Sequence, residues 1–104
     1  MEAHLKKLSD ELKAGQAQLF DVREEQEWEE GHLKDAQLVP LSGLESGSCP
    51  KNLDKTRKTY LHCRSGQRVY RAAPLLQKMG FKEVVPLDEG FADLVDEGFP
   101  ESGE

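Results

Sequence analysis

The sequence has little cysteine and no long apolar segment. Its only cysteines are Cys49 and Cys63 among 104 residues, far below the cysteine density of a disulfide scaffold, which favours a reducing compartment. No stretch approaches the length of a membrane span, and the opening residues MEAHLKKLSDELKAG contain no apolar core of signal-peptide length. Charged residues make up 33% of the chain and hydrophobic residues 37%. These features predict one soluble, cytoplasmic domain over residues 1–104, without a membrane span.

Acidic residues are almost absent from one part of the chain. Residues 51–82 contain nine Lys or Arg residues and a single acid, Asp54, so the segment has a formal charge of +8 in a chain of net charge −6. Clustered positive charge attracts an anionic substrate and stabilises a thiolate, and Cys63 lies in this segment. The alternative is a solvated helix face with lysine-rich edges. Nucleic acid is not an expected partner, because the chain is acidic overall and lacks interleaved basic and aromatic residues.

The histidines and cysteines of the sequence also lack the spacing that is typical of metal ligands. The three histidines and two cysteines are dispersed along the chain, so no set of metal ligands is predicted. Cys49 lies in the Gly- and Ser-rich segment SGLESGSCPKN, residues 42–52, which we expect to be a loop. Cys49 is either a resolving thiol for Cys63 or, in the interpretation we favour, an incidental surface cysteine.

Short apolar runs alternate with segments of helical spacing along the chain. The runs expected to form strands are AQLFDVR (17–23), AQLVPL (36–41), KTYLHC (58–63) and FKEVVPL (81–87). The segments expected to form helices are the one with Leu5, Leu8 and Leu12 before Gly15, then REEQEWEEGH (23–32), GQRVYRAAPLLQKMG (66–80) and EGFADLVDEG (89–98). This order is typical of an α/β domain with a mostly parallel sheet and helices on both faces. Sites in such sheets form beyond the carboxyl ends of the strands, where Cys63 falls.

The segment CRSGQR, residues 63–68, has the composition of an anion-binding loop. Gly66 permits a tight curve, and a tight curve leading into a helix turns backbone N–H groups inward at the positive end of the helix dipole. A sulfur atom at the start of this loop would accept from these donors, which favours the thiolate. Arg64 and Arg68 add charges whose planar forks suit sulfonate or phosphate oxygens. We therefore interpret Cys63 as a nucleophile in an anion cradle rather than as a small buried residue at a strand end.

Two enzyme chemistries use a cradle of this kind: hydrolysis of phosphate esters and transfer of sulfane sulfur through a cysteine persulfide. Cysteine phosphatases of this type have a longer loop between cysteine and arginine. Here four residues separate Cys63 from Arg68, and Val69 occupies the position where a phosphatase needs its arginine. The shorter loop fits a persulfide sulfur better than a tetrahedral phosphate. A phosphatase also needs a general acid, and nothing in the loop identifies one.

Three segments resemble the rhodanese family, specifically its single-domain members. LFDVREEQEWEEGHLKDAQLVPL (19–41) is similar to the N-terminal signature of the family. YLHCRSGQRVYRAAPLLQKMGF (60–81) is similar to its active-site strand, loop and helix, and VVPLDEGFADLVDEGFP (84–100) to its closing segment. The three segments stand in the right order at the right distances, so the resemblance covers nearly the whole chain.

The resemblance implies a rhodanese-like α/β fold, with a central, mostly parallel five-stranded sheet and helices on both faces. It also implies thiosulfate sulfurtransferase chemistry. Cys63 would take the outer sulfur of thiosulfate, or of a related small anionic donor, as a persulfide and pass it to a thiophilic acceptor such as cyanide, a thiol or a protein. This double displacement needs no metal or organic cofactor. A persulfide carrier that serves one partner is the alternative, and a small cysteine phosphatase or arsenate reductase comes third.

The resemblance further implies roles for individual residues. Cys63 would be the catalytic residue, and Arg64 and Arg68 would hold the anionic end of the donor. Backbone N–H groups of the loop would hold the persulfide, so that the substrate-binding residues are Arg64, Ser65, Gly66, Gln67 and Arg68. Outside the loop, and apart from the resemblance, Asp21 and Arg23 at the end of a strand and His32 after a helix stop are expected to give structural support. The alternative is a functional role for Asp21 and Arg23, and a role as a base for His32. His62 is expected to point away from Cys63, because neighbouring side chains alternate along a strand.

Overall fold

Four short parallel strands form the centre of the domain. In the computed structural model, which describes residues 1–102, the strands are β1 (Ala17–Asp21), β2 (Ala36–Leu38), β3 (Lys58–His62) and β4 (Val84–Pro86). Their order in the sheet is β2-β1-β3-β4, and every neighbouring pair is parallel. Each strand lies inside one of the four predicted runs, so the prediction of an α/β fold with a parallel sheet is confirmed.

The expectation of five strands is wrong, because the sheet in residues 1–102 has four. The segment before β1 has leucines at helical rather than alternating spacing, and Leu5 and Leu8 are buried on one side of a helix. Near the other end of the described chain, Glu101 makes only an isolated antiparallel bridge with Leu33. Neither segment therefore has the extended, alternating pattern that adds a strand to a sheet.

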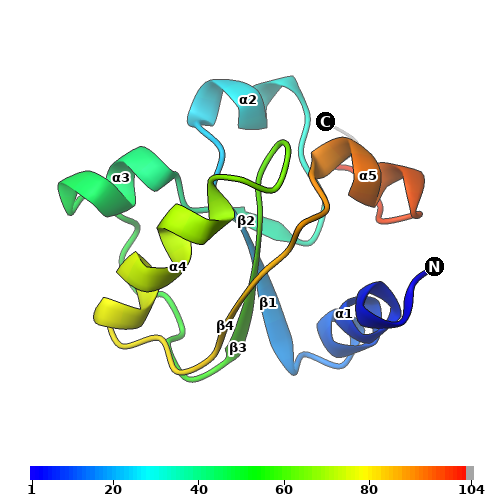
Figure 1. Ribbon diagram of the computed structural model, residues 1–104, viewed down its shortest axis with the longest axis horizontal. Coiled ribbons are helices and arrows are strands. Elements are labelled where there is room, and N and C mark those ends of the chain that lie inside the picture. The colour runs from blue at the N-terminus through cyan, green and yellow to red at the C-terminus, as the bar shows by residue number, and fades with distance from the viewer. Residues whose placement is uncertain (103–104) are drawn as a thin grey trace.

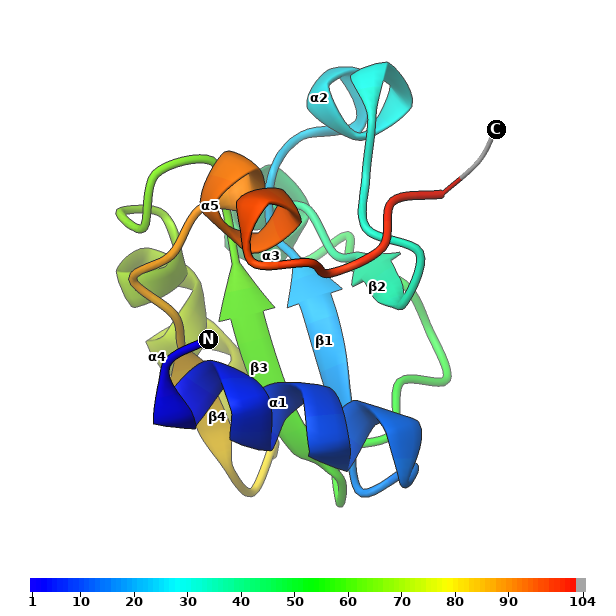
Figure 2. The ribbon, with the colours of Figure 1, turned by 90° about the vertical axis from the view of Figure 1, so that its right-hand side faces the viewer.

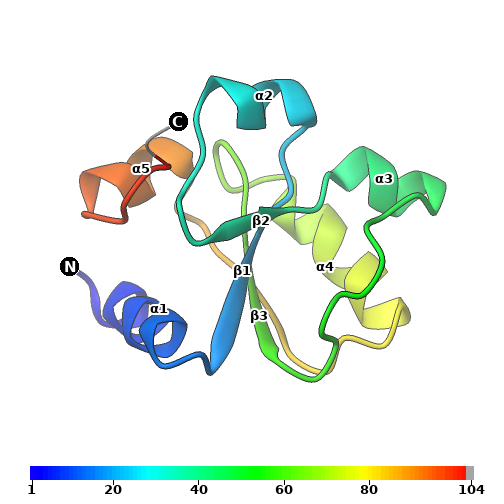
Figure 3. The same ribbon diagram turned by 180° about the vertical axis from the view of Figure 1, so that it is seen from behind.

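Five helices in the described part of the chain, residues 1–102, pack around the sheet. They are α1 (Ala3–Lys13), α2 (Glu25–Glu30), α3 (Leu41–Ser46), α4 (Val69–Lys78) and α5 (Phe91–Asp96). Helices α3 and α4 lie on one side of the sheet, and α1 and α5 lie on the other (Figures 1 and 3). Figure 2 shows β1 and β3 pointing toward the end of the molecule where α2 and α5 lie, and β2 and β4 run parallel to them. No helix within residues 1–102 combines the length and the apolar character that crossing a bilayer requires.

The prediction of a loop over residues 42–52 is wrong in its first half, where α3 forms. Leu41 and Leu44 are three residues apart and both are buried, so this short helix forms because it covers the sheet with one apolar face. Pro40 precedes it with a φ of −61°, a conformation that suits the entry to a helix. Gly47 then adopts a left-handed φ of 79° and ends it.

The buried side chains of the two central strands, β1 and β3, point alternately to opposite sides of the sheet and so form two core clusters, one on each side. Phe20 and Leu61 belong to the cluster covered by α3 and α4, which also contains Cys63. Leu19 and Tyr60 belong to the cluster covered by α1 and α5. Successive strand residues point to opposite faces, so each central strand contributes to both clusters, which fixes the sheet between its two helical layers.

Candidate active site

Cys63 lies between the end of β3 and the start of α4, at the carboxyl edge of the sheet. Its side chain is only 1% exposed. Within the loop that follows, the backbone N–H of Gly66 donates a hydrogen bond to Cys63 Sγ over 3.2 Å. Gly66 has a φ of 80°, a conformation that residues with a Cβ rarely adopt. The loop therefore curves back over the sulfur, as the sequence predicted.

A second segment, residues 88–91, closes over the cysteine loop. The Phe91 N–H donates to the Cys63 carbonyl over 2.9 Å. A Cβ placed on Gly90 would stand 1.8 Å from the Arg64 carbonyl oxygen, and one on Gly66 would stand 2.3 Å from the Asp88 carbonyl oxygen. The two backbones thus touch at both glycines, which leaves no room for side chains and holds the cysteine loop in one shape.

Asp21 and Arg23 form a buried ion pair where β1 ends. Their side chains are 0% and 5% exposed. Arg23 Nη2 donates to Asp21 Oδ2 over 2.8 Å and to the Gly31 carbonyl over 2.7 Å. The Arg23 guanidinium also lies 4.4 Å from the centre of the Phe91 ring. This pair therefore ties the end of β1 to the residue after α2 and to the start of α5, around the cysteine loop.

The variant Asp21→Asn is expected to lower the free energy of unfolding by about 2 kcal/mol, because it leaves the charge of the buried Arg23 uncompensated. Urea denaturation followed by circular dichroism measures the change. Asp10→Asn is the matched control, because Asp10 pairs with Lys6 at an exposed site, where such pairs contribute little. Equal losses in the two variants would contradict the structural role of the Asp21–Arg23 pair.

His62 is a buried histidine beside this ion pair. It pairs with Asp21 in the sheet register, and its Nε2 lies 3.6 Å from Asp21 Oδ2 without a hydrogen-bond partner among the described residues. Burial lowers the pKa of His62, and the nearby Asp21 carboxylate offsets part of that effect. The ring lies 6.4 Å from the Phe91 ring, centre to centre. These contacts give His62 a packing role at the end of the sheet.

Arg68 is held by a partner that the sequence did not suggest. Its Nη1 and Nη2 atoms donate to the two carboxylate oxygens of Glu27 over 2.6 and 2.8 Å. Glu27 also accepts from the Glu24 N–H and so completes a capping box at the start of α2. The hydrogen bonds from Arg68 hold the pKa of Glu27 at about 2. Glu27 is therefore charged at neutral pH and neutralises one of the two arginines predicted to bind the donor.

This lowered pKa predicts how the ion pair contributes to stability as pH changes. The folded-state pKa of Glu27 lies below its ordinary value of 4.5, so its contribution is present above about pH 4.5 and is lost as pH falls toward about 2. The difference in unfolding free energy between wild type and Glu27→Gln should therefore shrink over that range. Urea denaturation at about pH 6 and about pH 3 tests this, and a constant difference would contradict the pairing.

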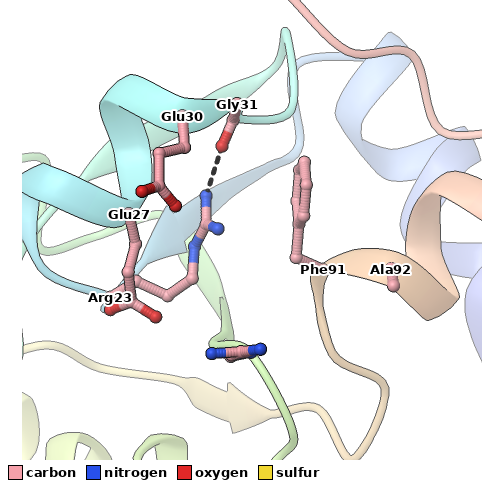
Figure 4. A pocket seen from close by; sticks show the side chains of 7 residues that line it. Arg23, Glu27, Glu30, Gly31, Phe91 and Ala92 are labelled. Carbon is pink, nitrogen blue, oxygen red and sulfur yellow. Dashed lines mark hydrogen bonds between the residues drawn. The ribbon is translucent and has the colours of Figure 1, made fainter.

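A cleft of about 400 Å³ opens beside the cysteine loop. The residues that line it are Arg23, Glu27, Glu30, Gly31, Arg64, Phe91 and Ala92. Figure 4 shows Arg23 extending to the Gly31 carbonyl, with Phe91 opposite. Cys63 is not among the described residues that line the cleft, and its 1% exposure places the sulfur below the surface. The cleft can hold a small molecule next to the loop, while the loop shields the sulfur.

The predicted site residues lie at different distances from this cleft. Arg64 is exposed and lines it, whereas Ser65 and Gln67 are exposed and their side chains make no hydrogen bond within residues 1–102. His32 lies outside the cleft, where its Nδ1 is 2.9 Å from the Trp28 carbonyl oxygen and its ring stacks on Trp28 at 3.6 Å. Of the three residues expected to give structural support, Arg23 lines the cleft, whereas Asp21 and His32 do not.

Sequence reasoning did not identify Glu27, Glu30 and Phe91 as site residues. No local spacing signals them, because they reach the cleft only through the packing of α2 and α5 beside the cysteine loop. Cys49 also differs from expectation, since it is half-buried against the core cluster that contains Cys63. Both cysteines are free thiols.

One cluster of potential metal ligands occurs away from the cleft. Ligand atoms of Glu2, His4 and Glu89 all lie within 4.8 Å of one another. Glu2 and His4 are exposed, and His4 Nε2 is 2.9 Å from the Glu89 carboxylate. We assign this group to a hydrogen-bonded contact between His4 of α1 and Glu89 in the segment before α5.

Curated proteins similar to this chain include two that are linked to sulfur transfer by name, MoeZ and YrkF, and others whose names give no such link, among them YqhL. Protein YqhL of Bacillus subtilis is 42% identical over 84 residues, which is 79% of this chain and 65% of that protein. The probable adenylyltransferase/sulfurtransferase MoeZ of Mycobacterium tuberculosis is 38% identical over 69% of this chain and 18% of its own length. The putative sulfur carrier protein YrkF of B. subtilis is 33% identical over 72% of this chain and 40% of its own. The chain thus spans less than two thirds of each of these relatives.

Solved structures agree with the fold. The Alr3790 protein from Anabaena superposes with a TM-score of 0.79 at 27% identity, over 94% of this chain and 77% of that one. A rhodanese-related protein from Thermoplasma volcanium gives 0.76 at 26% identity, over 95% and 94%. A family profile described as a rhodanese-like domain matches residues 4–97. The chain belongs to the family of rhodanese-like domains.

Proposed function

We propose that this domain is a sulfurtransferase that carries sulfane sulfur on Cys63. The observation that carries the proposal is the placement of Cys63 Sγ, which accepts the Gly66 N–H inside a curved loop next to a cleft. Backbone donors in such a loop stabilise a negative charge on sulfur, first on the thiolate and then on the persulfide. The similarity to proteins named as a sulfurtransferase and a sulfur carrier supports the same chemistry.

The reaction has two displacements, with thiosulfate as the proposed donor. In the first, the Cys63 thiolate attacks the outer sulfur, the S–S bond of thiosulfate breaks, and its electron pair leaves with sulfite. In the second, a thiophilic acceptor such as cyanide or a thiolate takes the outer sulfur, and the Cys63 thiolate is regenerated. Atoms and charges balance without a cofactor, because sulfur is transferred as a neutral atom between two nucleophiles. A chain with only two cysteines suits a reducing compartment, so we propose the cytoplasm as the location of this cycle.

The backbone and the side chains of the cysteine loop would bind different parts of the donor. The N–H groups of residues 64–68 would surround the outer sulfur, and Arg64, which is exposed at the cleft, would bind the sulfonate oxygens through its planar fork. Arg68 is the second candidate, although Glu27 occupies its guanidinium. Phosphatase chemistry is disfavoured, because Val69 stands where the phosphate-binding arginine is needed and is fully buried in the core.

A second candidate is a persulfide carrier that delivers its sulfur to one protein. Cys63 is 1% exposed, so any acceptor must approach the sulfur through the loop, and the similarity to a putative sulfur carrier protein supports delivery to a protein. Slow transfer to cyanide combined with fast transfer to a single protein acceptor would favour the carrier. Fast transfer to cyanide would favour the enzyme.

Intact-protein mass spectrometry before and after thiosulfate tests the proposed function. The expected result is a gain of one sulfur atom, mapped by peptide analysis to Cys63 rather than Cys49 and removed by cyanide. Sulfur on Cys49 alone would contradict the assignment of the site. No gain on either cysteine would rule out thiosulfate as the donor, and arsenate and aryl phosphates would be the next substrates to assay.

A further inference from the structure

The Arg68 guanidinium is already occupied in the resting structure. Its two terminal nitrogens bind both oxygens of the Glu27 carboxylate, at 2.6 and 2.8 Å. This is the bidentate geometry that an arginine offers to the oxygens of a sulfonate. The carboxylate and the anionic end of a donor therefore compete for the same nitrogen atoms. Glu27 lines the cleft and is 24% exposed, whereas Arg68 is 29% exposed behind it and is not among the described lining residues. An anion in the cleft therefore meets the Glu27 carboxylate before it can reach Arg68.

The charges around the cleft add to this competition. Arg23 is compensated by Asp21, and Arg68 by Glu27. Within residues 1–102, Arg64 and Glu30 make no ion pair, and both line the cleft. A dianion entering the cleft thus meets one unpaired cation, one unpaired carboxylate and a second carboxylate already bound to Arg68. This arrangement is less favourable to a dianion than the charge of +8 over residues 51–82 suggests.

We propose that Glu27 is a specificity-determining residue, which by holding Arg68 disfavours dianionic sulfur donors and favours donors of lower charge, such as thiosulfonates. The inference rests on the proposed sulfur-transfer function and names its substrate class. Thiosulfate must displace Glu27 to use both arginines of the loop. A thiosulfonate carries a single negative charge and an organic group, which the Phe91 and Ala92 side of the cleft can contact. Arg64 alone then suffices for its anionic end.

The chemistry is the same for both donors. The Cys63 thiolate attacks the outer sulfur of a thiosulfonate, the S–S bond breaks, and its electron pair leaves with a sulfinate instead of sulfite. The persulfide formed on Cys63 is identical. The ratio of kcat/KM for the two donors therefore reports how strongly the cleft discriminates between a dianionic and a monoanionic donor, because both donors form the same persulfide.

The substitution that tests this is Glu27→Gln. Glutamine retains an amide oxygen for the Glu24 N–H, so the capping box of α2 can persist. We expect kcat/KM for thiosulfate to rise roughly three- to tenfold relative to that for benzenethiosulfonate. Glu45→Gln is the matched control, since Glu45 pairs with Arg71 of α4, the helix that begins directly after Arg68, but away from the cleft. An unchanged donor ratio in Glu27→Gln, or an equal rise in Glu45→Gln, would overturn the proposal.

A binding measurement separates this inference from the proposed function. Calorimetric titration of sulfite into Cys63→Ser, with and without Glu27→Gln, reports dianion binding without turnover. Tighter binding in the double variant is expected, and the gain should vanish when Arg68→Gln is added. If Glu27→Gln tightens sulfite binding but wild type forms no persulfide, the role of Glu27 is supported and the proposed sulfur transfer is contradicted. Weaker or unchanged binding would overturn the role of Glu27 even if persulfide forms.

Discussion

Substitution of Gly90 by alanine is expected to destabilise the domain by about 3 kcal/mol or more. The φ and ψ angles of Gly90 are −87° and −176°, which any residue adopts, so the effect does not come from backbone strain. It comes from space, because the added Cβ would stand 1.8 Å from the Arg64 carbonyl oxygen and 3.0 Å from the Ser65 nitrogen. Both are backbone atoms of the cysteine loop, so the loop or the closing segment must move. Chemical denaturation measures the loss.

The control for this prediction is Gly47→Ala. Gly47 has a left-handed φ of 79° and no atom within 4 Å of an added Cβ, so its substitution costs only the conformational penalty of about 1 kcal/mol. Gly90→Ala should therefore cost more, although its backbone angles are ordinary. It should also reduce sulfur transfer, since displacement of the Arg64 carbonyl disturbs the N–H groups that follow it. A loss in Gly90→Ala no larger than in Gly47→Ala would show that the two segments are not in tight contact.

Replacement of Cys63 by serine is expected to reduce sulfur transfer from thiosulfate at least about 10³-fold. A serine hydroxyl is not ionised at neutral pH and attacks sulfur poorly, whereas a thiolate is the nucleophile of sulfur exchange. The fold should persist, because the serine oxygen can accept the Gly66 N–H that Cys63 Sγ accepts. Steady-state assays with thiosulfate and cyanide, together with thermal unfolding of the same preparation, separate lost chemistry from lost structure.

Cys49→Ser is the companion variant. Cys49 packs at the edge of the core cluster that contains Cys63 but lies outside the cysteine loop. Serine should lower stability slightly there and leave the transfer rate unchanged, if Cys63 alone carries the sulfur. Loss of transfer in Cys49→Ser with retention in Cys63→Ser would reverse the assignment of the nucleophile.

The elements predictable from the sequence are those whose pattern is local. Apolar runs such as AQLFDVR and KTYLHC identified β1 and β3, and the leucine spacing before Gly15 identified α1. Helix α3 was missed because Gly43 and its serines are typical of a loop. It forms because burial of Leu41 and Leu44 outweighs that local preference. The fifth strand came from family resemblance, and no segment of the described chain has the pattern to supply it.

The candidate site, like the fold, was predictable from the sequence only where its features are local. The Cys63 loop was predicted from its glycine and its position between strand and helix, all features of contiguous residues. The pairing of Arg68 with Glu27 was not, because the two residues are 41 positions apart and no spacing rule links them. The same holds for the contact of Gly90 with Arg64. Contacts between residues far apart in the sequence determine which arginine of the loop has no carboxylate partner. The formal charge of residues 51–82 therefore overstated the capacity of this segment to bind anions.

The hydrogen bond from the Phe91 N–H to the Cys63 carbonyl has a consequence for how the thiol is protected. Opening of this closing segment is a local unfolding event, which needs less free energy than global unfolding. Such opening would expose Cys63, which is otherwise only 1% exposed, to oxidants too bulky to reach it in the closed structure. The population of the opened state would then limit the rate at which bulky oxidants modify Cys63. Amide exchange at Phe91 and loss of the reactive thiol should therefore proceed in step.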